Sequence, residues 1–135
     1  MAPQQPQNKR RQAEQRGRWA EQYTLFWLRA QGYRLLARRY QSPMGEIDLI
    51  MRRGTKIIFV EVKYRKSHKN LETSLPPRQQ NRIALGAADW ITKFTQTLKG
   101  NEIFQIDVVW ITPFSKPKRL QNAITLSDRQ TRSGY

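Results

Sequence analysis

The sequence contains no cysteine and a single histidine, His68. The absence of cysteine excludes a disulfide framework and thiolate metal sites, and it fits a reducing cytoplasm. A histidine with no second histidine or cysteine nearby is a poor candidate for a catalytic role. Apolar runs are short, since none approaches the roughly 18 residues of a membrane span, and the N-terminus lacks the hydrophobic segment of an export signal. We therefore expect a cytoplasmic protein that crosses no membrane.

Acidic residues are scarce relative to basic ones. Ten Asp and Glu stand against 25 Lys and Arg, which gives a net charge of +15. An excess of this size attracts polyanions through phosphate contacts and counterion release. Nucleic acid is therefore the expected partner, with acidic proteins or membrane surfaces as the alternatives.

Length and composition predict one domain between two irregular ends. With 135 residues and 38% hydrophobic content, the chain suffices for one modest core. Residues 1–16, MAPQQPQNKRRQAEQR, have little apolar content and predict a disordered basic arm. Residues 17–127 are expected to form the domain, and residues 128–135 a frayed tail.

Hydrophobic periodicity predicts a helix, three strands, a second helix and two more strands. The first helix is expected at 18–31, with Trp19, Tyr23, Phe26, Trp27 and Ala30 as its main apolar stripe and Leu25 and Leu28 as a smaller group on another side. Strands are expected at 33–40, 103–112 and 120–126, and two more, joined by a tight turn, within 45–66. The second helix is expected between residues 76 and 99. A helical crossover between the third and fourth strands predicts a mixed sheet of about five strands with helices on its faces.

The stretch 45–66, GEIDLIMRRGTKIIFVEVKYRK, carries the clearest chemical pattern. If Gly54 and Thr55 form a two-residue hairpin loop, Asp48 lies opposite Glu61. Lys63 follows two residues along the same face. Opposed carboxylates repel, so a divalent cation, Mg²⁺ or Mn²⁺, is one means of compensation. The alternative is a solvated or ion-paired strand face without a metal.

This stretch resembles known nucleases. Asp48 followed by Glu61, Val62 and Lys63 is similar to the PD-(D/E)xK signature of restriction-endonuclease-like enzymes. The longer strings GEIDLI and FVEVKYR resemble the YraN-like family of small bacterial proteins, related in fold to archaeal Holliday junction resolvases, over about residues 17–112. The resemblance implies an α/β restriction-endonuclease-like fold and a magnesium- or manganese-dependent nuclease. It also implies selection of substrate structure rather than sequence, DNA more than RNA as the substrate, and by analogy a homodimer.

The resemblance also implies roles for individual residues. Asp48 and Glu61, with the carbonyl of Val62, would hold the ion, and Glu21 of the first helix would reach it. Lys63 would lie beside the attacking water or the phosphate. Gln80, at the start of the second helix, would orient one of them. The basic residues expected to contact nucleic acid are Arg65, Lys66 and Lys69 in the loop after the hairpin and Arg78 and Arg82 on the second helix.

Two further functions stay open at this stage. The first is a nucleic-acid-binding protein that keeps the nuclease scaffold without cutting, and the second is a small basic protein associated with RNA or ribosomes. The chain departs from the usual family residues at Thr24, Arg39 and Gln105, where relatives carry Ala, Asn and Arg. Asp107 matches a family position but is expected to be a structural or indirect partner rather than a ligand.

Overall fold

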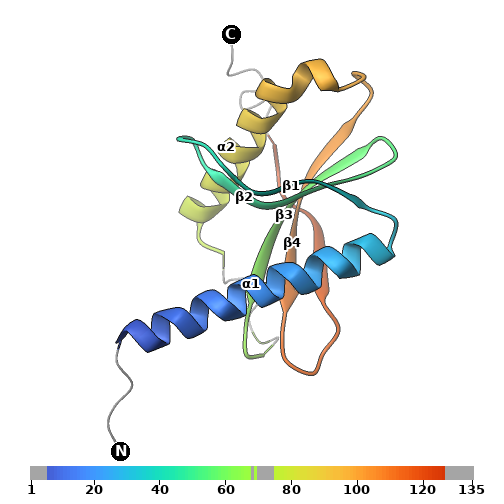
Figure 1. The fold of residues 1–135 in the computed structure, drawn as a ribbon. Coiled ribbons are helices and arrows are strands. Elements are labelled where there is room, and N and C mark those ends of the chain that lie inside the picture. The colour runs from blue at the N-terminus through green and yellow to red at the C-terminus, as the bar shows by residue number, and fades with distance from the viewer. Residues whose placement is uncertain (1–5, 68, 70–74, 127–135) are drawn as a thin grey trace, which may run out of the picture.

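The computed structural model describes residues 6–67, 69 and 75–126. The remaining residues, which include His68 and the predicted tail 128–135, lie outside this description. The elements are α1 (Pro6–Ala30), β1 (Arg34–Gln41), β2 (Glu46–Arg53), β3 (Lys56–Tyr64), α2 (Pro77–Phe94), the short 3₁₀ helix η2 (Thr95–Thr97), β4 (Ile103–Ile111) and β5 (Lys118–Ile124). Their order confirms the predicted succession of helices and strands (Figure 1).

The five strands form one sheet in the order β1-β2-β3-β4-β5. Only β3 and β4 run parallel, and α2 provides the crossover between them. The other neighbours are antiparallel. The hairpin between β2 and β3 turns at Gly54, whose positive φ of 62° suits a residue without a Cβ. Arg53 pairs with Lys56, which confirms the predicted register of the hairpin.

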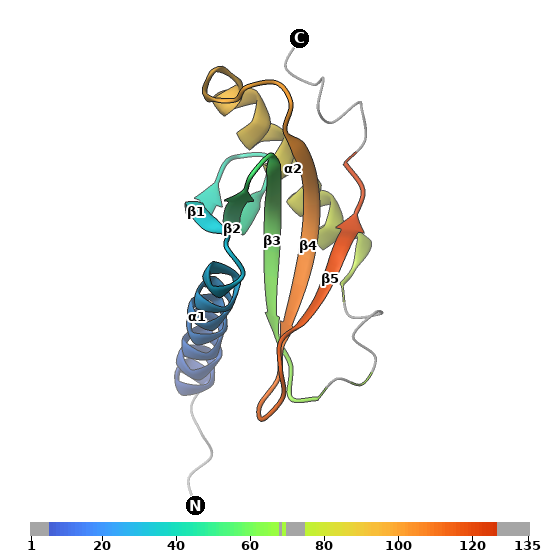
Figure 2. The same ribbon diagram turned by 90° about the vertical axis from the view of Figure 1, so that its right-hand side faces the viewer.

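One helix covers each face of the sheet (Figure 2). On the α1 side, Leu28 packs with Met51 and Val60. On the α2 side, Ile83 and Trp90 are among the buried residues of the other core cluster. Parallel strands covered on both faces have few polar positions, and β4 accordingly buries its residues from Ile106 to Ile111. Neither helix of the described residues is long and apolar enough to cross a membrane.

Helix α1 begins at Pro6, earlier than predicted. Residues 6–16 were expected to belong to a disordered arm, but the structure makes them helical, with exposed side chains. Gln, Lys, Arg, Ala and Glu dominate this segment and all have favourable helix propensity. The arm is therefore a helical extension that contributes no buried side chain to the core.

The apolar stripe predicted for the first helix is on the wrong side. Helix α1 instead buries Ala20, Thr24, Leu25 and Leu28, and the hydroxyl of Thr24 donates to the carbonyl of Ala20 at 2.7 Å. Three aromatic residues of the predicted stripe are exposed, with Trp19 50%, Tyr23 42% and Phe26 56% accessible, whereas Trp27 is partly buried against the α1-side core. Ala20 and Thr24, four residues apart, are small enough to let the helix approach the sheet closely. The free energy gained from this close packing outweighs the greater hydrophobicity of the aromatic side of the helix.

A close contact between two glycines places α2 against the start of β2. A Cβ on Gly45 would collide with the carbonyl of Arg82, and one on Gly86 would lie 3.0 Å from the amide nitrogen of Glu46. The loop before β2 and the second helix therefore touch through their backbones. This contact sets where the first turns of α2 lie relative to β2.

Helix α2 itself ends at Phe94, earlier than the predicted 99.

Candidate active site

The candidate site lies where β2 and β3 separate. Their backbone pairing runs from Arg53 and Lys56 to Leu49 and Val60. Because a two-residue hairpin makes alternate pairs hydrogen-bonded, Leu49 and Val60 form a hydrogen-bonded pair and the next pair, Asp48 with Glu61, does not. Directly opposed side chains approach most closely in a pair of this second kind. The register therefore brings the two carboxyl groups together, as predicted.

The side chain of Asp48 takes part in the backbone pairing itself. The amide of Val62 donates to Asp48 Oδ2 at 2.8 Å. If the pairing of β2 and β3 continued beyond Leu49, this amide would instead donate to a backbone carbonyl of β2. Ile47 also departs from the expected alternation, since it packs on the α2 side although Leu49 packs on the α1 side. Beyond Leu49 the two strands are thus held together by a carboxylate.

The two carboxyl groups form a mutually repelling pair. Asp48 is partly buried, Glu61 is 7% exposed, and the two side chains share a hydrogen bond. Burial and the charge of Glu61 raise the pKa of Asp48 from 3.8 to about 8, against the lowering effect of the Val62 amide. Burial also raises the pKa of Glu61. A low-dielectric site disfavours two adjacent negative charges, so the pair favours a proton or another cation.

Lys63 and Gln79 both contact the same oxygen of Glu61. Lys63 Nζ lies 3.2 Å from Glu61 Oε1, and Gln79 Nε2 donates to that oxygen at 3.2 Å. Lys63 supplies one positive charge against two carboxyl groups, and Glu46 adds further negative potential at Glu61. The lysine therefore only partly compensates the charge of the pair.

Glu21 acts electrostatically on the site but is held by an arginine. Its charge is among the causes that raise the pKa of Asp48, so α1 places it within electrostatic range of the pair. Its carboxylate forms an ion pair with Arg39 at 3.0 Å. Arg39 has a positive φ of 48°, a conformation that asparagine tolerates better than most residues.

The two glutamines at the start of α2 have different partners. Gln80, the residue predicted to lie at the site, donates its side-chain amide to the carbonyl of Leu75 at 2.8 Å. Gln79 is the one that reaches Glu61. The sequence did not single out Gln79, because Gln79 and Gln80 lie four and three residues before the buried Ile83 and both spacings fall on the same side of a helix.

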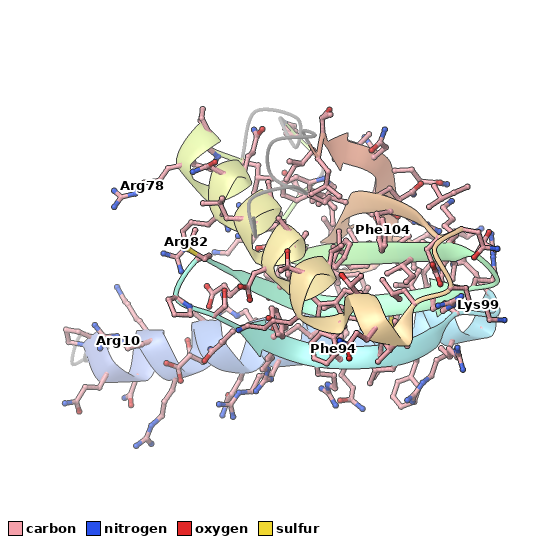
Figure 3. The ribbon with its side chains drawn as sticks, turned by 90° about the horizontal axis from the view of Figure 1, so that it is seen from above. Arg10, Arg78, Arg82, Phe94, Lys99 and Phe104 are labelled. Atoms are coloured by element: carbon pink, nitrogen blue, oxygen red, sulfur yellow. The ribbon has the colours of Figure 1, made fainter. Side chains whose placement is uncertain are left out.

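The predicted nucleic-acid contacts divide into two groups. Arg78 and Arg82 are exposed and extend from the first turns of α2, at the end of the molecule toward which the first half of α1 also runs (Figure 3). Lys66 and Lys69 are exposed in the loop after β3. Arg65 is partly buried, and its guanidinium lies 5.4 Å from the ring centre of Trp110. The four exposed residues have the accessibility that phosphate contacts require.

Asp107 is part of the framework. It is fully buried, forms an ion pair with Arg119 at 2.8 Å and accepts the amide of Asn122. Arg119 in turn donates to the hydroxyl of Tyr33 at 3.0 Å. These contacts join β4, β5 and the start of β1. These contacts give Asp107 the structural role that was one of the two roles expected for it.

The donor set of the site is small. Among residues 6–67, 69 and 75–126, no three acidic or histidine side chains are grouped so that they could hold a metal ion. Asp48 and Glu61 form a two-carboxylate set, and the carbonyl of Val62 points to the same strand edge as its amide because both groups of an extended residue face one way. Magnesium commonly takes one or two carboxylates and completes its shell with water and phosphate oxygens. The residues present therefore fit such an ion.

Fold and site together define a class: small basic α/β proteins with a carboxylate pair and a lysine where two strands of a mixed sheet diverge. The sequence profile of Uncharacterised protein family UPF0102 matches residues 20–111. The chain belongs to this family, which confirms the YraN-like resemblance.

Several curated relatives are similar over much of the chain. A UPF0102 protein of Erythrobacter litoralis is 38% identical over 115 residues, which cover 85% of this chain and 97% of the relative. One of Methylorubrum populi is 38% identical over 124 residues, covering 92% and 98%. One of Maricaulis maris is 51% identical over 81 residues, covering 60% and 64%.

Proposed function

We propose that the protein is a metal-dependent nuclease of the restriction-endonuclease-like class that hydrolyses phosphodiester bonds in nucleic acid. The observation that carries the proposal is the partly buried pair of Asp48 and Glu61 with Lys63 3.2 Å from Glu61. A protein that only binds nucleic acid gains nothing from repelling carboxylates at its surface, because they oppose the phosphates. Such a pair is useful where a cation is held against a phosphate.

Asp48 and Glu61 would hold Mg²⁺ or Mn²⁺, with the carbonyl of Val62 as a further oxygen donor. When bound, such an ion polarises a phosphoryl oxygen and lowers the pKa of a water molecule. Lys63 keeps an ammonium group beside Glu61, where it offsets negative charge and can contact the scissile phosphate. The amide of Gln79 fixes the Glu61 carboxylate through Oε1.

The basic residues around the pair support a nucleic-acid substrate. Arg78 and Arg82 lie on the first turns of α2, the helix that also carries Gln79. Lys66 and Lys69 follow the strand that carries Glu61 and Lys63. A net charge of +15 adds a long-range attraction for phosphate backbones. We propose DNA as the preferred substrate, selected by structure rather than by base sequence.

Cleavage assays test the proposal directly. The purified protein would be incubated with labelled single-stranded, duplex, flapped and branched DNA and with RNA, in Mg²⁺, in Mn²⁺ and in EDTA. Cleavage should require the metal, and Asp48→Asn and Glu61→Gln should each reduce the rate about 100-fold or more, since the ion's charge stabilisation is worth several kcal/mol. Asp89→Asn, a change of an acidic residue on α2 outside the pair, should keep the activity.

Two outcomes would contradict the nuclease function. Metal-independent cleavage, or equal cleavage by the wild type and both variants, would identify a contaminating enzyme. Tight binding without cleavage of any substrate would favour a nucleic-acid-binding protein on the same scaffold.

A further inference from the structure

The exposed aromatic residues of α1 adjoin a groove. Trp19 and Tyr23 stack with ring centres 5.5 Å apart, and Trp19 meets Tyr64 edge to face at 6.5 Å. On one side of Trp19, a hollow of about 300 Å³ is lined by Arg16, Tyr64 and their neighbours. On the other side, a hollow of about 410 Å³ extends to Phe114 and Lys116 in the β4–β5 connection. We refer to these adjoining hollows as the aromatic groove.

The aromatic groove is rimmed by cations. Arg16 lines one end and Lys116 the other. Arg65 and Lys66 line a third hollow, which adjoins the first at Arg16 and Tyr64. Phe114 is fully exposed at the turn, with a positive φ of 61° that few residues other than glycine adopt readily. Large aromatic side chains held in water cost free energy unless a partner covers them. Aromatic faces between cations match a ligand with flat rings and an anionic backbone.

We infer that the aromatic groove binds an unpaired strand of nucleic acid, with bases stacked on Trp19, Tyr23 and Phe114 and phosphates near the surrounding cations. Base stacking on aromatic side chains combined with a basic groove is the common solution for single strands, and it tolerates any sequence. The inference rests on the proposed nucleic-acid partner, but it does not depend on cleavage.

The groove and the carboxylate pair share two elements but lie on opposite faces of the sheet. Tyr64 follows Lys63 on β3 and packs with the α1-side core, whereas Glu61, in phase with Lys63, contacts Gln79 of α2. On α1, Trp19 precedes Glu21 by two residues. In both ribbon views the β4–β5 connection extends from the end of the sheet where β3 finishes (Figures 1 and 2). A strand in the groove would therefore reach the pair by passing around the end of β3. The substrate class that follows is nucleic acid with a single-stranded segment, such as a flap, a gap or an open junction.

A second copy of the chain is a less suitable occupant. Pairing two such faces would bring Arg16, Arg65, Lys66 and Lys116 of each copy close to their counterparts. Like charges opposed across an interface cost several kcal/mol. An anionic membrane would satisfy the cations, but its flat surface does not follow a groove with aromatic walls.

Binding measurements in EDTA test the inference without any contribution from cleavage. Fluorescence anisotropy of labelled oligodeoxythymidine and oligouridine would be compared with that of a closed duplex hairpin, for the wild type and for Trp19→Ala and Phe114→Ala. Each variant should weaken single-strand binding roughly 5- to 150-fold, the loss expected for one stacked base. Duplex binding should change less than twofold, and Trp19→Phe should restore most of the loss.

Phe26→Ala is the matched control, since Phe26 is also exposed on α1 but lines neither hollow. It should bind single strands as the wild type does. Equal losses in Phe26→Ala and Trp19→Ala, or equal losses on single strands and duplex, would overturn the inference. So would a dimer that Trp19→Ala dissociates in sedimentation, or binding to phosphatidylserine vesicles that requires Trp19 while single-strand binding does not. Cleavage that fails in every assay would leave the binding result unaffected.

Discussion

The carboxylate of Asp48 replaces a backbone carbonyl as the acceptor for the amide of Val62, at 2.8 Å. This exchange couples the end of strand pairing to the position of the proposed metal ligand. The hydrogen bond holds one oxygen of Asp48, and the hydrogen bond with Glu61 orients the group toward its partner. The rotamer of Asp48 is thus fixed by the fold before any ligand arrives.

Neutralising Asp48 should stabilise the protein at high pH. The pKa of Asp48 is raised from 3.8 to about 8 by burial and by Glu61. A carboxyl group with a raised folded-state pKa contributes its full stability below its unfolded pKa and loses it as the pH rises through the folded one. Asp48→Asn should therefore raise Tm relative to the wild type on the order of 5 °C near pH 8 in EDTA. The difference should close toward pH 4, as thermal denaturation across this range would measure.

Asp89→Asn is the control for this pH experiment. Burial raises the pKa of Asp89, but hydrogen bonds from Tyr40 and Lys93 outweigh it, so the net shift is downward. Asp89→Asn should therefore lower Tm at every pH above the ordinary pKa of an aspartate side chain. An Asp48→Asn variant that loses stability at pH 8 would show that the repulsion within the pair is already relieved.

Adding Mg²⁺ should raise the Tm of the wild type more at pH 8 than at pH 6. A cation that binds only the folded protein adds about 2.7 kcal/mol at a concentration of 100 times Kd, and at lower pH it competes with the proton on the pair. Asp48→Asn and Glu61→Gln should both lose this shift, and EDTA should reverse it. An equal shift in both variants would place the ion elsewhere.

Gln79 and Gln80 should have separable effects. Gln79→Ala removes the donor to Glu61 and should reduce Mg²⁺ affinity about 10- to 100-fold, the usual cost of losing a group that orients a ligand. Gln80→Ala removes the contact with the Leu75 carbonyl and should lower stability by about 1 kcal/mol without changing Mg²⁺ affinity. Isothermal titration and urea denaturation of both variants measure the two quantities. The reversed pattern would make Gln80 the residue that acts at the site.

Releasing Glu21 from Arg39 should strengthen cation binding. Arg39→Asn removes the ion pair and suits the positive φ of 48° at this position. Because the arginine is 45% exposed, losing the pair should change stability by less than about 1 kcal/mol. Mg²⁺ affinity should rise severalfold in titration calorimetry. Arg38→Asn is the comparison, since Arg38 donates to Gln22 and not to Glu21. Equal affinities in both variants would exclude Glu21 from the site.

Gly45→Ala should be the most destabilising of these changes. Its Cβ would meet the carbonyl of Arg82, a backbone group that cannot move without shifting α2. We expect a loss of about 1–3 kcal/mol, typical of overpacking, in urea denaturation. Gly17→Ala is the control, because that glycine lies within α1 with nothing close to its Cβ position. This second change should stabilise the helix by up to about 1 kcal/mol.

The hairpin was predictable because its constraints are local. A glycine with positive φ fixes the loop, the loop fixes the register, and the register sets Asp48 opposite Glu61. The order of strands around a crossover helix follows from equally general rules. Both predictions required only the spacing of residues along the chain.

Other features depend on contacts that spacing does not reveal. The core side of α1 is chosen by the fit of Ala20 and Thr24 against the sheet, and periodicity alone favoured the aromatic side. The choice between Gln79 and Gln80 depends on how α2 is rotated, which the backbone contact at Gly45 helps to set.

The helical extension at residues 6–16 carries several of the protein's cations and no core side chain. Removing it should therefore leave a folded domain with a reduced charge. A share of the affinity for polyanions is thus separable from the integrity of the fold, and substitutions in this extension should have little effect on folding. A shortened protein that begins near Gly17 would offer crystallisation trials a more compact particle with less surface charge.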